Sequence, residues 1–373
     1  NPELFKRIKA VYVKKDELDL NPEQLMLLTK IYDGFVRGGA NLDPEKQARF
    51  REINEELSKL SVQFGDNVLA ETNSYQMVIE NEDDLAGLPE WLKTSAAEVA
   101  NRTGHEGKWV FTVHNPSWIP FLQYSENREL REKLFRAYFM RGNNNNENDN
   151  KEIFQKIIPL RLERAQLLGY TSHADFVLEN TMAKTPENVN QFLLSLWDPA
   201  LKRAKSEAYD MQKMIDAEGK NFSLQSWDWW YYAEKVRKDK YDLEENMLKP
   251  YFPLEGVKKG IFLLTEKLWG LQYEKLTNVP VYHEEAEVYE VKEADGKHIG
   301  LLYMDFHPRE SKRGGAWMTA FRSQHINKDG QYITPVITIV CNFTRPSGDT
   351  PALLSIDEVE TFFHEFGHAL HGL

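Results

Sequence analysis

The final segment, residues 355–373, constrains the fold of this chain more than any other stretch, because three independent signals in it predict a helix. Ser355 and Glu358 have the spacing of a capping box, in which two residues satisfy backbone N–H groups at a helix start. Asp357 adds further negative charge to the first turn, where the helix dipole favours it. Apolar residues then recur at helical spacing. They form one stripe along the helix, made of Val359, Phe362, Phe363, Phe366 and Leu370.

His364 and His368 lie four residues apart on the face of this helix opposite the apolar stripe. Residues with that spacing are neighbours one turn apart, with Cβ atoms about 5–6 Å from each other. Two imidazoles so placed can each bring a nitrogen to about 2.0–2.1 Å from one Zn²⁺. Glu365 lies beside them but off the ligand line, where a general base for a metal-activated water is needed. The pattern His-Glu-x-x-His therefore predicts a zinc site with His364 and His368 as ligands and Glu365 as the base.

Two other interpretations of this pattern remain open. In the first, both histidines are solvated residues on an amphipathic helix and bind nothing. In the second, Glu365 and His368 belong to a di-iron helical bundle, which needs a second Glu-x-x-His pair on another helix. No other histidine in the sequence has a glutamate three residues before it, so the zinc site is favoured over the di-iron site.

Composition excludes several classes of protein. The chain has 373 residues and a net charge of −12, which argues against a nucleic-acid partner because phosphate binding depends on Lys and Arg. No apolar run approaches the roughly 18 residues of a membrane-spanning helix, so we expect no membrane partner. The single cysteine, Cys341, excludes an internal disulfide framework and is expected to be a small buried residue.

The two ends of the sequence leave the compartment open. The chain starts at Asn1 without a methionine or a signal-like apolar segment. We therefore expect a chain cut at both ends. A cytoplasmic location is favoured, and a periplasmic one is possible.

Helical patterns dominate the first 270 residues or so, and a strand-rich block follows them. A heptad-like series runs through a long helix after Asp43-Pro44, at Phe50, Ile53, Leu57, Leu60 and Phe64. Period-two patterns predict short strands at 75–80, 108–114, 285–291, 300–306 and 332–342. The last three precede the 355–373 helix directly. The sequence thus predicts a mainly α protein with a small β-sheet next to the His-Glu-x-x-His helix.

Gly314, Gly315 and Ala316 stand between two of these predicted strands. Paired glycines at the start of a strand let a second backbone approach closely. We therefore interpret them as part of an edge strand that pairs with an extended peptide substrate. The alternative is an ordinary loop with a glycine turn.

Together these residues resemble the thimet oligopeptidase and peptidyl-dipeptidase family of zinc metallopeptidases. The stretch from His364 to His371 matches the extended zinc signature of that family, which is more specific than the five-residue pattern. Other similar stretches cover much of the chain from about residue 150 onward: 160–170, 228–232, 251–254 and 305–312. Residues 312–317 and 351–354 look most like the bacterial peptidyl-dipeptidase (dipeptidyl carboxypeptidase) branch.

The resemblance implies a two-lobed, mainly helical metallopeptidase body with a deep substrate channel that admits short, unstructured peptides. One lobe would comprise residues 1–48 and 245–373, and residues 49–244 would form the helical channel wall. The implied activity is zinc-dependent release of C-terminal dipeptides by a monomer with one Zn²⁺ per complete enzyme. Glu365 would take a proton from water and pass it to the leaving amine. An oligoendopeptidase of the same family is the alternative.

The resemblance also indicates what is missing. Family members take a third zinc ligand, a Glu, and their oxyanion-stabilising Tyr and His from beyond the position of Leu373. His371 is interpreted as a substrate-binding residue of the cleft, because it lies almost two turns from His364. We expect the 373 residues alone to bind zinc weakly and to be inactive. An inactive fragment or a metal-free peptide-binding scaffold is the alternative of another class, although the intact Glu365 argues against a decayed site.

Overall fold

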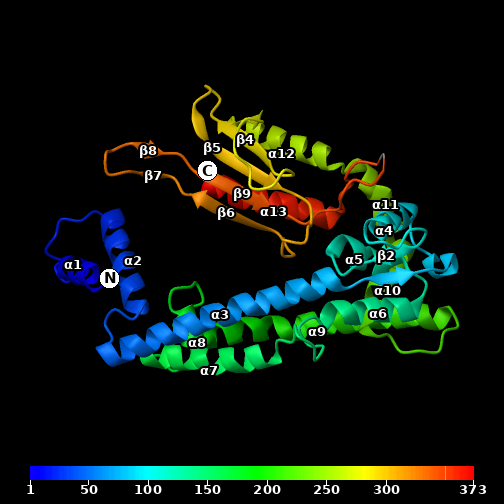
Figure 1. Ribbon diagram of the computed structural model, residues 1–373, viewed down its shortest axis with the longest axis horizontal. Helices are drawn as coiled ribbons and strands as arrows, with labels where there is room; N and C mark the ends of the chain where they lie inside the picture. Colours follow the sequence, from blue (N-terminus) through cyan, green and yellow to red (C-terminus); the bar gives the residue numbers. More distant parts are fainter. Residues whose placement is uncertain (349) are drawn as a thin grey trace. The chain divides into compact units, whose positions relative to one another are not determined.

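The computed structural model describes residues 1–348 and 350–373, and in this part of the chain it is mainly α-helical with small β-sheets (Figure 1). The chain divides into two compact units. The first unit comprises Asn1–Ala70 and Gly142–Lys205, and the second comprises Glu71–Arg141 and Ser206–Leu373. The mainly α fold class is confirmed. The lobe boundaries and the deep channel implied by the family resemblance stay predictions.

The first unit is helical. It contains α1 (Pro2–Tyr12), α2 (Pro22–Arg37), α7 (Lys151–Leu167), α8 (His173–Leu178), most of α3 (Pro44–Ser74) and the first part of α9 (Pro186–Ala217). The heptad-like series predicted after Asp43-Pro44 lies on α3. Its central members Ile53, Leu57 and Leu60 are buried against Ile153 and Ile157 of α7. The series therefore marks the core-facing side of α3, as predicted.

The second unit has a helical part around a small two-stranded sheet. Strands β1 (Met77–Ile79) and β2 (Trp109–Phe111) pair antiparallel. Besides the ends of α3 and α9, the helical elements here are η1 (Glu82–Leu85), α4 (Glu90–Arg102), α5 (Asn115–Tyr124), α6 (Arg128–Phe139), η2 (Ser226–Asp228), α10 (Trp229–Tyr241), α11 (Glu245–Leu248) and η3 (Lys249–Tyr251). Asp228 is fully buried and forms ion pairs with Arg128 and Arg131 at 2.9 and 3.0 Å, which tie the start of α10 to α6.

The remainder of the second unit contains the sheet that precedes the final helix. Its strand order is β3-β4-β5-β9-β6. The strands are β3 (Gln272–Leu276), β4 (Glu287–Lys292), β5 (His298–Asp305), β6 (Trp317–Arg322) and β9 (Val336–Val340). Among the described strands of this sheet, β5 and β9 pair in parallel and the other neighbours pair antiparallel, with β6 at one edge. The strand predicted at 332–342 is split into β8 (Tyr332–Ile333), which pairs with β7 (His325–Ile326), and β9.

Close packing fixes the register between β5 and β9. A Cβ built on Gly300 would lie 2.8 Å from the carbonyl oxygen of Pro335, so only glycine fits at this position. The same carbonyl accepts a hydrogen bond from the amide of Leu301 at 3.1 Å. The absence of a side chain at Gly300 therefore allows the two backbones to come close enough for this hydrogen bond to form where β5 and β9 begin to pair.

Helices α12 (Leu254–Trp269) and α13 (Ile356–Gly372) share one apolar core with the sheet. This core includes Ile261 from α12, Phe362 and Phe366 from α13, and Leu302 and Ile339 from the strands. Figure 1 shows α13 beside β6 and β9, which are the strands it contacts. The small sheet predicted next to the His-Glu-x-x-His helix is thus confirmed.

None of the helices in the described residues combines the length and the apolar character that crossing a membrane requires.

Candidate metal centre

The capping box that the sequence predicts fixes the start of α13. The Ser355 hydroxyl oxygen accepts a hydrogen bond from the Glu358 amide at 3.1 Å, and the Glu358 carboxylate accepts one from the Ser355 amide at 2.8 Å. The same carboxylate accepts hydrogen bonds from the Thr344 amide and hydroxyl at 2.7 and 3.0 Å. Burial raises the pKa of Glu358 above its usual value. The capping residue therefore also ties α13 to the chain that leaves β9.

The apolar face of α13 is anchored by aromatic packing. The Phe362 ring is fully buried and contacts the rings of Phe306 and Phe343, with centroids at 5.1 and 5.9 Å. The predicted stripe is wrong at Phe363, which is 41% exposed. Glu365 and Ala369 are buried, because the sheet meets α13 on the side of Phe362 away from Phe363.

The two predicted ligands converge from the opposite face. His364 and His368 are both exposed, and their Nε2 atoms lie 3.1 Å apart. The ring planes are nearly perpendicular, at 82°, with centroids 4.8 Å apart. Two nitrogens at about 2.0–2.1 Å from a tetrahedral Zn²⁺ are separated by about 3.3 Å. The observed pair therefore fits one zinc ion without rebuilding either side chain.

A third ligand does not join this pair from the part of the chain that the structure describes. No group of three or more His, Cys, Asp or Glu side chains there has the geometry to hold a metal ion. His371 is exposed on the last turn of α13, on the same side as the two histidines but beyond them. The described residues thus offer a metal two nitrogen ligands.

Glu365 lies beside the histidines at the border between the exposed and the buried faces. The residue is only 7% exposed. Among the described residues, no hydrogen bond or ion pair reaches its carboxylate. Its oxygens are not among the fully buried polar atoms that lack a partner in the described residues, so the carboxylate can be reached by a water molecule. Its role as a general base stays a prediction.

A buried ion network holds the loop that carries the glycine pair. Asp305 ends β5 and is 1% exposed, and it receives two hydrogen bonds from Arg309 at 2.8 Å each. The Lys312 ammonium donates to the Asp305 carboxylate at 2.9 Å and to the His307 carbonyl at 2.8 Å. Burial alone would raise the pKa of Asp305, but the hydrogen bonds from Arg309 and Lys312 hold it below its usual value. The network fixes the chain immediately before Gly314.

Asn342 fixes the other side of the same loop. Its side-chain amide donates hydrogen bonds to the carbonyls of Arg313 and Gly315, at 3.0 and 2.6 Å. Gly315 has a φ of +95°, a left-handed conformation that favours glycine. The chain then enters β6, whose second half is exposed along the sheet edge. The edge strand predicted after the glycines is therefore present, while its pairing with a peptide is not tested by these contacts.

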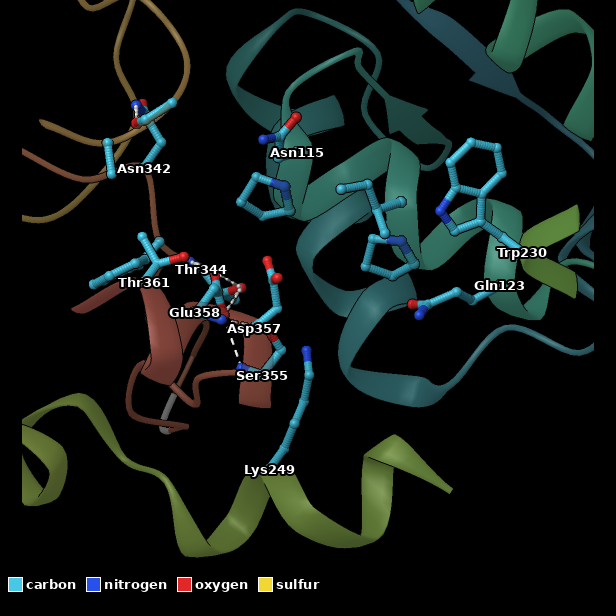
Figure 2. Close-up of a pocket in the computed structure, with 16 residues that line it drawn as sticks. Asn115, Gln123, Trp230, Lys249, Asn342, Thr344, Ser355, Asp357, Glu358 and Thr361 are labelled. Carbon is cyan, nitrogen blue, oxygen red and sulfur yellow. Dashed lines mark hydrogen bonds between the residues drawn. The ribbon is translucent and has the colours of Figure 1, made fainter. Parts of the chain in front are cut away.

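A cavity of about 390 Å³ opens beside this loop (Figure 2). Helix α13 contributes Asp357, Glu358 and Thr361 to its wall, and α5 faces it with Asn115 and Gln123. The other lining residues are Pro116, Ile119, Pro120, Trp230, Lys249, Gly315, Ala316, Asn342, Phe343, Thr344 and Ser355. Figure 2 shows the Asp357 side chain extending from α13 toward α5, and Lys249 reaching toward the start of α13.

The predicted site residues thus fall into two groups along α13. His364, Glu365 and His368 are together in its middle, whereas Gly315 and Ala316 lie at its N-terminal end as part of the cavity wall. Gly314 does not line the cavity, and His371 lies at the far end of the helix.

Several residues of the site were missed from the sequence. Asp357 and Thr361 precede His364 by seven and three residues, so helical periodicity could have placed them on the histidine face. Asn115, Gln123 and Asn342 come from distant segments. Nothing in their local sequence singles them out.

Comparison with known proteins places this arrangement among peptidases. The profile of peptidase family M3 matches residues 121–373. Dipeptidyl carboxypeptidase of Escherichia coli (strain K12) is 39% identical over 375 aligned residues, which cover 100% of this chain and 54% of that protein. Oligopeptidase A of Salmonella typhimurium (strain LT2) is 36% identical over 356 residues, covering 94% of this chain and 52% of that protein. The chain spans about half the length of the curated relatives it matches.

Proposed function

This chain belongs to peptidase family M3, and on that premise we propose that it carries the zinc-binding helix of a peptidase that cuts short, unstructured peptides. The observation that carries this proposal is the pair of Nε2 atoms 3.1 Å apart on α13, beside the largely buried residue Glu365. Because the chain spans about half the length of its relatives, the activity is proposed for the complete polypeptide. We expect that polypeptide to act as a monomer.

The residues of α13 have separable roles in this proposal. His364 and His368 would hold the metal through Nε2, and the buried aromatic face of α13 would keep their spacing fixed. Zn²⁺ held there supplies Lewis-acid chemistry, which polarises a peptide carbonyl and makes water more acidic. Glu365 would accept a proton from the attacking water and deliver it to the leaving nitrogen. The water oxygen would add to the carbonyl carbon as Glu365 takes its proton, and the C–N bond would break as the nitrogen receives that proton.

The edge strand supplies a place for the substrate. An extended peptide can add to an exposed sheet edge through backbone hydrogen bonds, and β6 provides such an edge next to α13. Lys312 and Asn342 hold the loop that contains Gly315 and Ala316. This fixed loop would determine which residues of the peptide lie opposite which residues of β6. We therefore propose that peptides bind antiparallel to β6.

Release of C-terminal dipeptides is the mode of cleavage we propose, and internal cleavage is the second candidate. The dipeptidyl carboxypeptidase of E. coli is 39% identical to this chain, and the oligopeptidase A of S. typhimurium is 36% identical. Mass spectrometry of the products of a defined octapeptide distinguishes the two modes. Successive losses of two C-terminal residues support the first, and one internal cut supports the second.

Metal content tests the site without relying on turnover. After confirmation of the intact mass, zinc is measured in the full 373-residue chain dialysed against a zinc buffer. We expect His364→Ala and His368→Ala each to reduce bound zinc at least tenfold, because a single ligand remains. Glu365→Gln should leave bound zinc unchanged and abolish turnover by the complete polypeptide. Equal zinc content in all variants would show that α13 is a metal-free scaffold.

A further inference from the structure

The cavity and the candidate metal ligands lie on one face of α13. Asp357, Thr361, His364 and His368 follow one another at intervals of four, three and four residues, so they form a single stripe on the helix. Asp357 precedes His364 by seven residues, which corresponds to about 10.5 Å along the helix axis. Thr361, which also lines the cavity, precedes His364 by three residues, or about 4.5 Å. The cavity thus extends along α13 from about one turn to about two turns before the metal ligands, on the N-terminal side.

The strand directions decide which end of a bound peptide reaches this cavity. A Cβ built on Gly372, at the end of α13, would lie 2.9 Å from Ile337 near the start of β9. Asn342, just after β9, lines the cavity at the beginning of α13. Helix α13 therefore runs opposite to β9 and in the same direction as β6, which pairs antiparallel with β9.

A peptide that adds antiparallel to β6 runs against this direction. Antiparallel pairing is the commoner arrangement in sheets, and β6 already pairs in this way with β9. The peptide would enter at the Arg322 end of β6 and leave at the Ala316 end, where the cavity opens. In an extended peptide, two residues span about 7 Å. The cavity is thus within reach of the two residues that follow the bond at the metal ligands.

We propose that this cavity binds the two residues on the C-terminal side of the cleaved bond, and that Asp357 makes it favour a basic side chain there. The inference rests on the proposed function, because the cleaved bond is placed at His364 and His368. It adds a subsite and a specificity-determining residue to that function.

The charges on the cavity wall support a role for Asp357. The ionisable lining residues are Lys249, Asp357 and Glu358. The Glu358 oxygens accept hydrogen bonds from Thr344 and Ser355. The Lys249 ammonium is buried against the Trp91 ring, 3.6 Å from its centroid. Asp357 is exposed, and among the described residues no hydrogen bond or ion pair reaches its carboxylate. Asp357 therefore offers an acceptor to a ligand.

The remaining lining residues suit a peptide better than an inorganic ion. Ile119, Pro120 and Trp230 form apolar walls, and Asn115 and Gln123 carry amides that can both donate and accept hydrogen bonds. A basic side chain of a bound dipeptide would thus meet the opposite charge of Asp357.

The other role available to Asp357 is purely local. A carboxylate in the first turn of a helix is stabilised by the helix dipole, and Asp357 would serve this purpose without any ligand. The two roles differ in their consequences. If the role is local, replacing Asp357 changes only the stability of α13. If Asp357 belongs to a subsite, replacing it changes the relative affinities of different dipeptides.

Isothermal titration calorimetry on the full 373-residue chain, without added metal, separates them. The probes are the dipeptides Ala-Arg and Ala-Glu at millimolar concentration. We expect Ala-Arg to bind about fivefold more tightly than Ala-Glu, which is the upper range for one partly exposed charge pair. Asp357→Asn should bring this ratio close to one. The matched control is Glu360→Gln, which removes one exposed charge from the same helix outside the cavity and should keep the ratio.

A second variant tests the cavity itself in a chain whose folding is checked. Thr361→Phe places a large side chain in the cavity and should abolish binding of both dipeptides, while circular dichroism shows an unchanged helix content. Absence of binding to the unaltered chain would overturn the proposal, and so would an unchanged ratio in Asp357→Asn. The zinc content of His364→Ala tests the proposed function independently, so a chain that binds zinc but no dipeptide refutes only this inference.

Discussion

Replacement of the buried Lys312 tests whether its ion network anchors the loop before Gly314. Its side chain is 3% exposed, and its ammonium donates to the Asp305 carboxylate and to the backbone carbonyls of Asp305 and His307, at 2.8–3.1 Å. Lys312→Met removes the charge and all of these hydrogen bonds while keeping a side chain of similar length. The carbonyls lose their donor, and the loop before Gly314 loses its anchor.

The expected loss follows from the contacts that remain. Removing one partner of a buried ion pair costs about 3–5 kcal/mol when the other charge is left uncompensated. Asp305 keeps both hydrogen bonds from Arg309, so its charge stays paired and the cost should fall at the lower end. We therefore expect Lys312→Met to reduce the free energy of unfolding by about 3 kcal/mol.

Urea unfolding followed by circular dichroism measures this loss. Lys275→Met is the matched control, because Lys275 forms an ion pair with Glu287 at 2.5 Å but its side chain is 51% exposed. An exposed pair is worth about 0–1 kcal/mol, so this variant should unfold almost like the unaltered chain. If the two variants lost the same stability, the buried network would not anchor the loop and the reasoning from burial would be wrong.

Three further predictions concern neighbouring parts of the same unit. Asn342→Ala removes the two hydrogen bonds to the glycine loop, so it should weaken Ala-Arg binding in calorimetry and cost only about 1 kcal/mol in urea. Burial lowers the pKa of His307 in the folded chain below its usual value of 6.5. As the pH drops below 6.5, the imidazole is therefore protonated in the unfolded chain before it is protonated in the folded chain. The free energy of unfolding should fall over this pH range. His307→Gln should flatten that part of the pH profile, whereas His325→Gln, at an exposed histidine, should not. Burial raises the pKa of the Cys341 thiol, so it should react with a disulfide reagent only after urea unfolding, and rapid reaction of the native chain would contradict its burial.

Much of the metal centre could be predicted because its geometry is local. A capping box involves residues three apart, and Ser355 and Glu358 form it as expected. The approach of His364 to His368 depends on one helical turn, so the spacing alone brings their rings together. The burial of Cys341 was predicted for a different reason, namely that an unpaired cysteine usually behaves as a small apolar residue.

The rest was decided by segments far apart in the sequence. Periodicity placed Phe363 in the apolar stripe, but the angle at which the sheet meets α13 leaves it exposed and buries Glu365. The sequence could not show that Lys312 is buried, since an isolated lysine is normally solvated and only Asp305 makes its burial possible. The position of β6 at the sheet edge depends on the parallel pairing of β5 with β9.

The sequence by itself therefore determined the chemical groups and their spacing along one helix. Tertiary structure decided what surrounds them: the buried side of α13, the free edge beside it, and the cavity at its N-terminal end. The physical reason is the range of the interactions. Helix caps and one-turn contacts are set by neighbouring residues, whereas burial and cavity shape depend on side chains such as Asn115 and Asn342, which only folding brings to the same place.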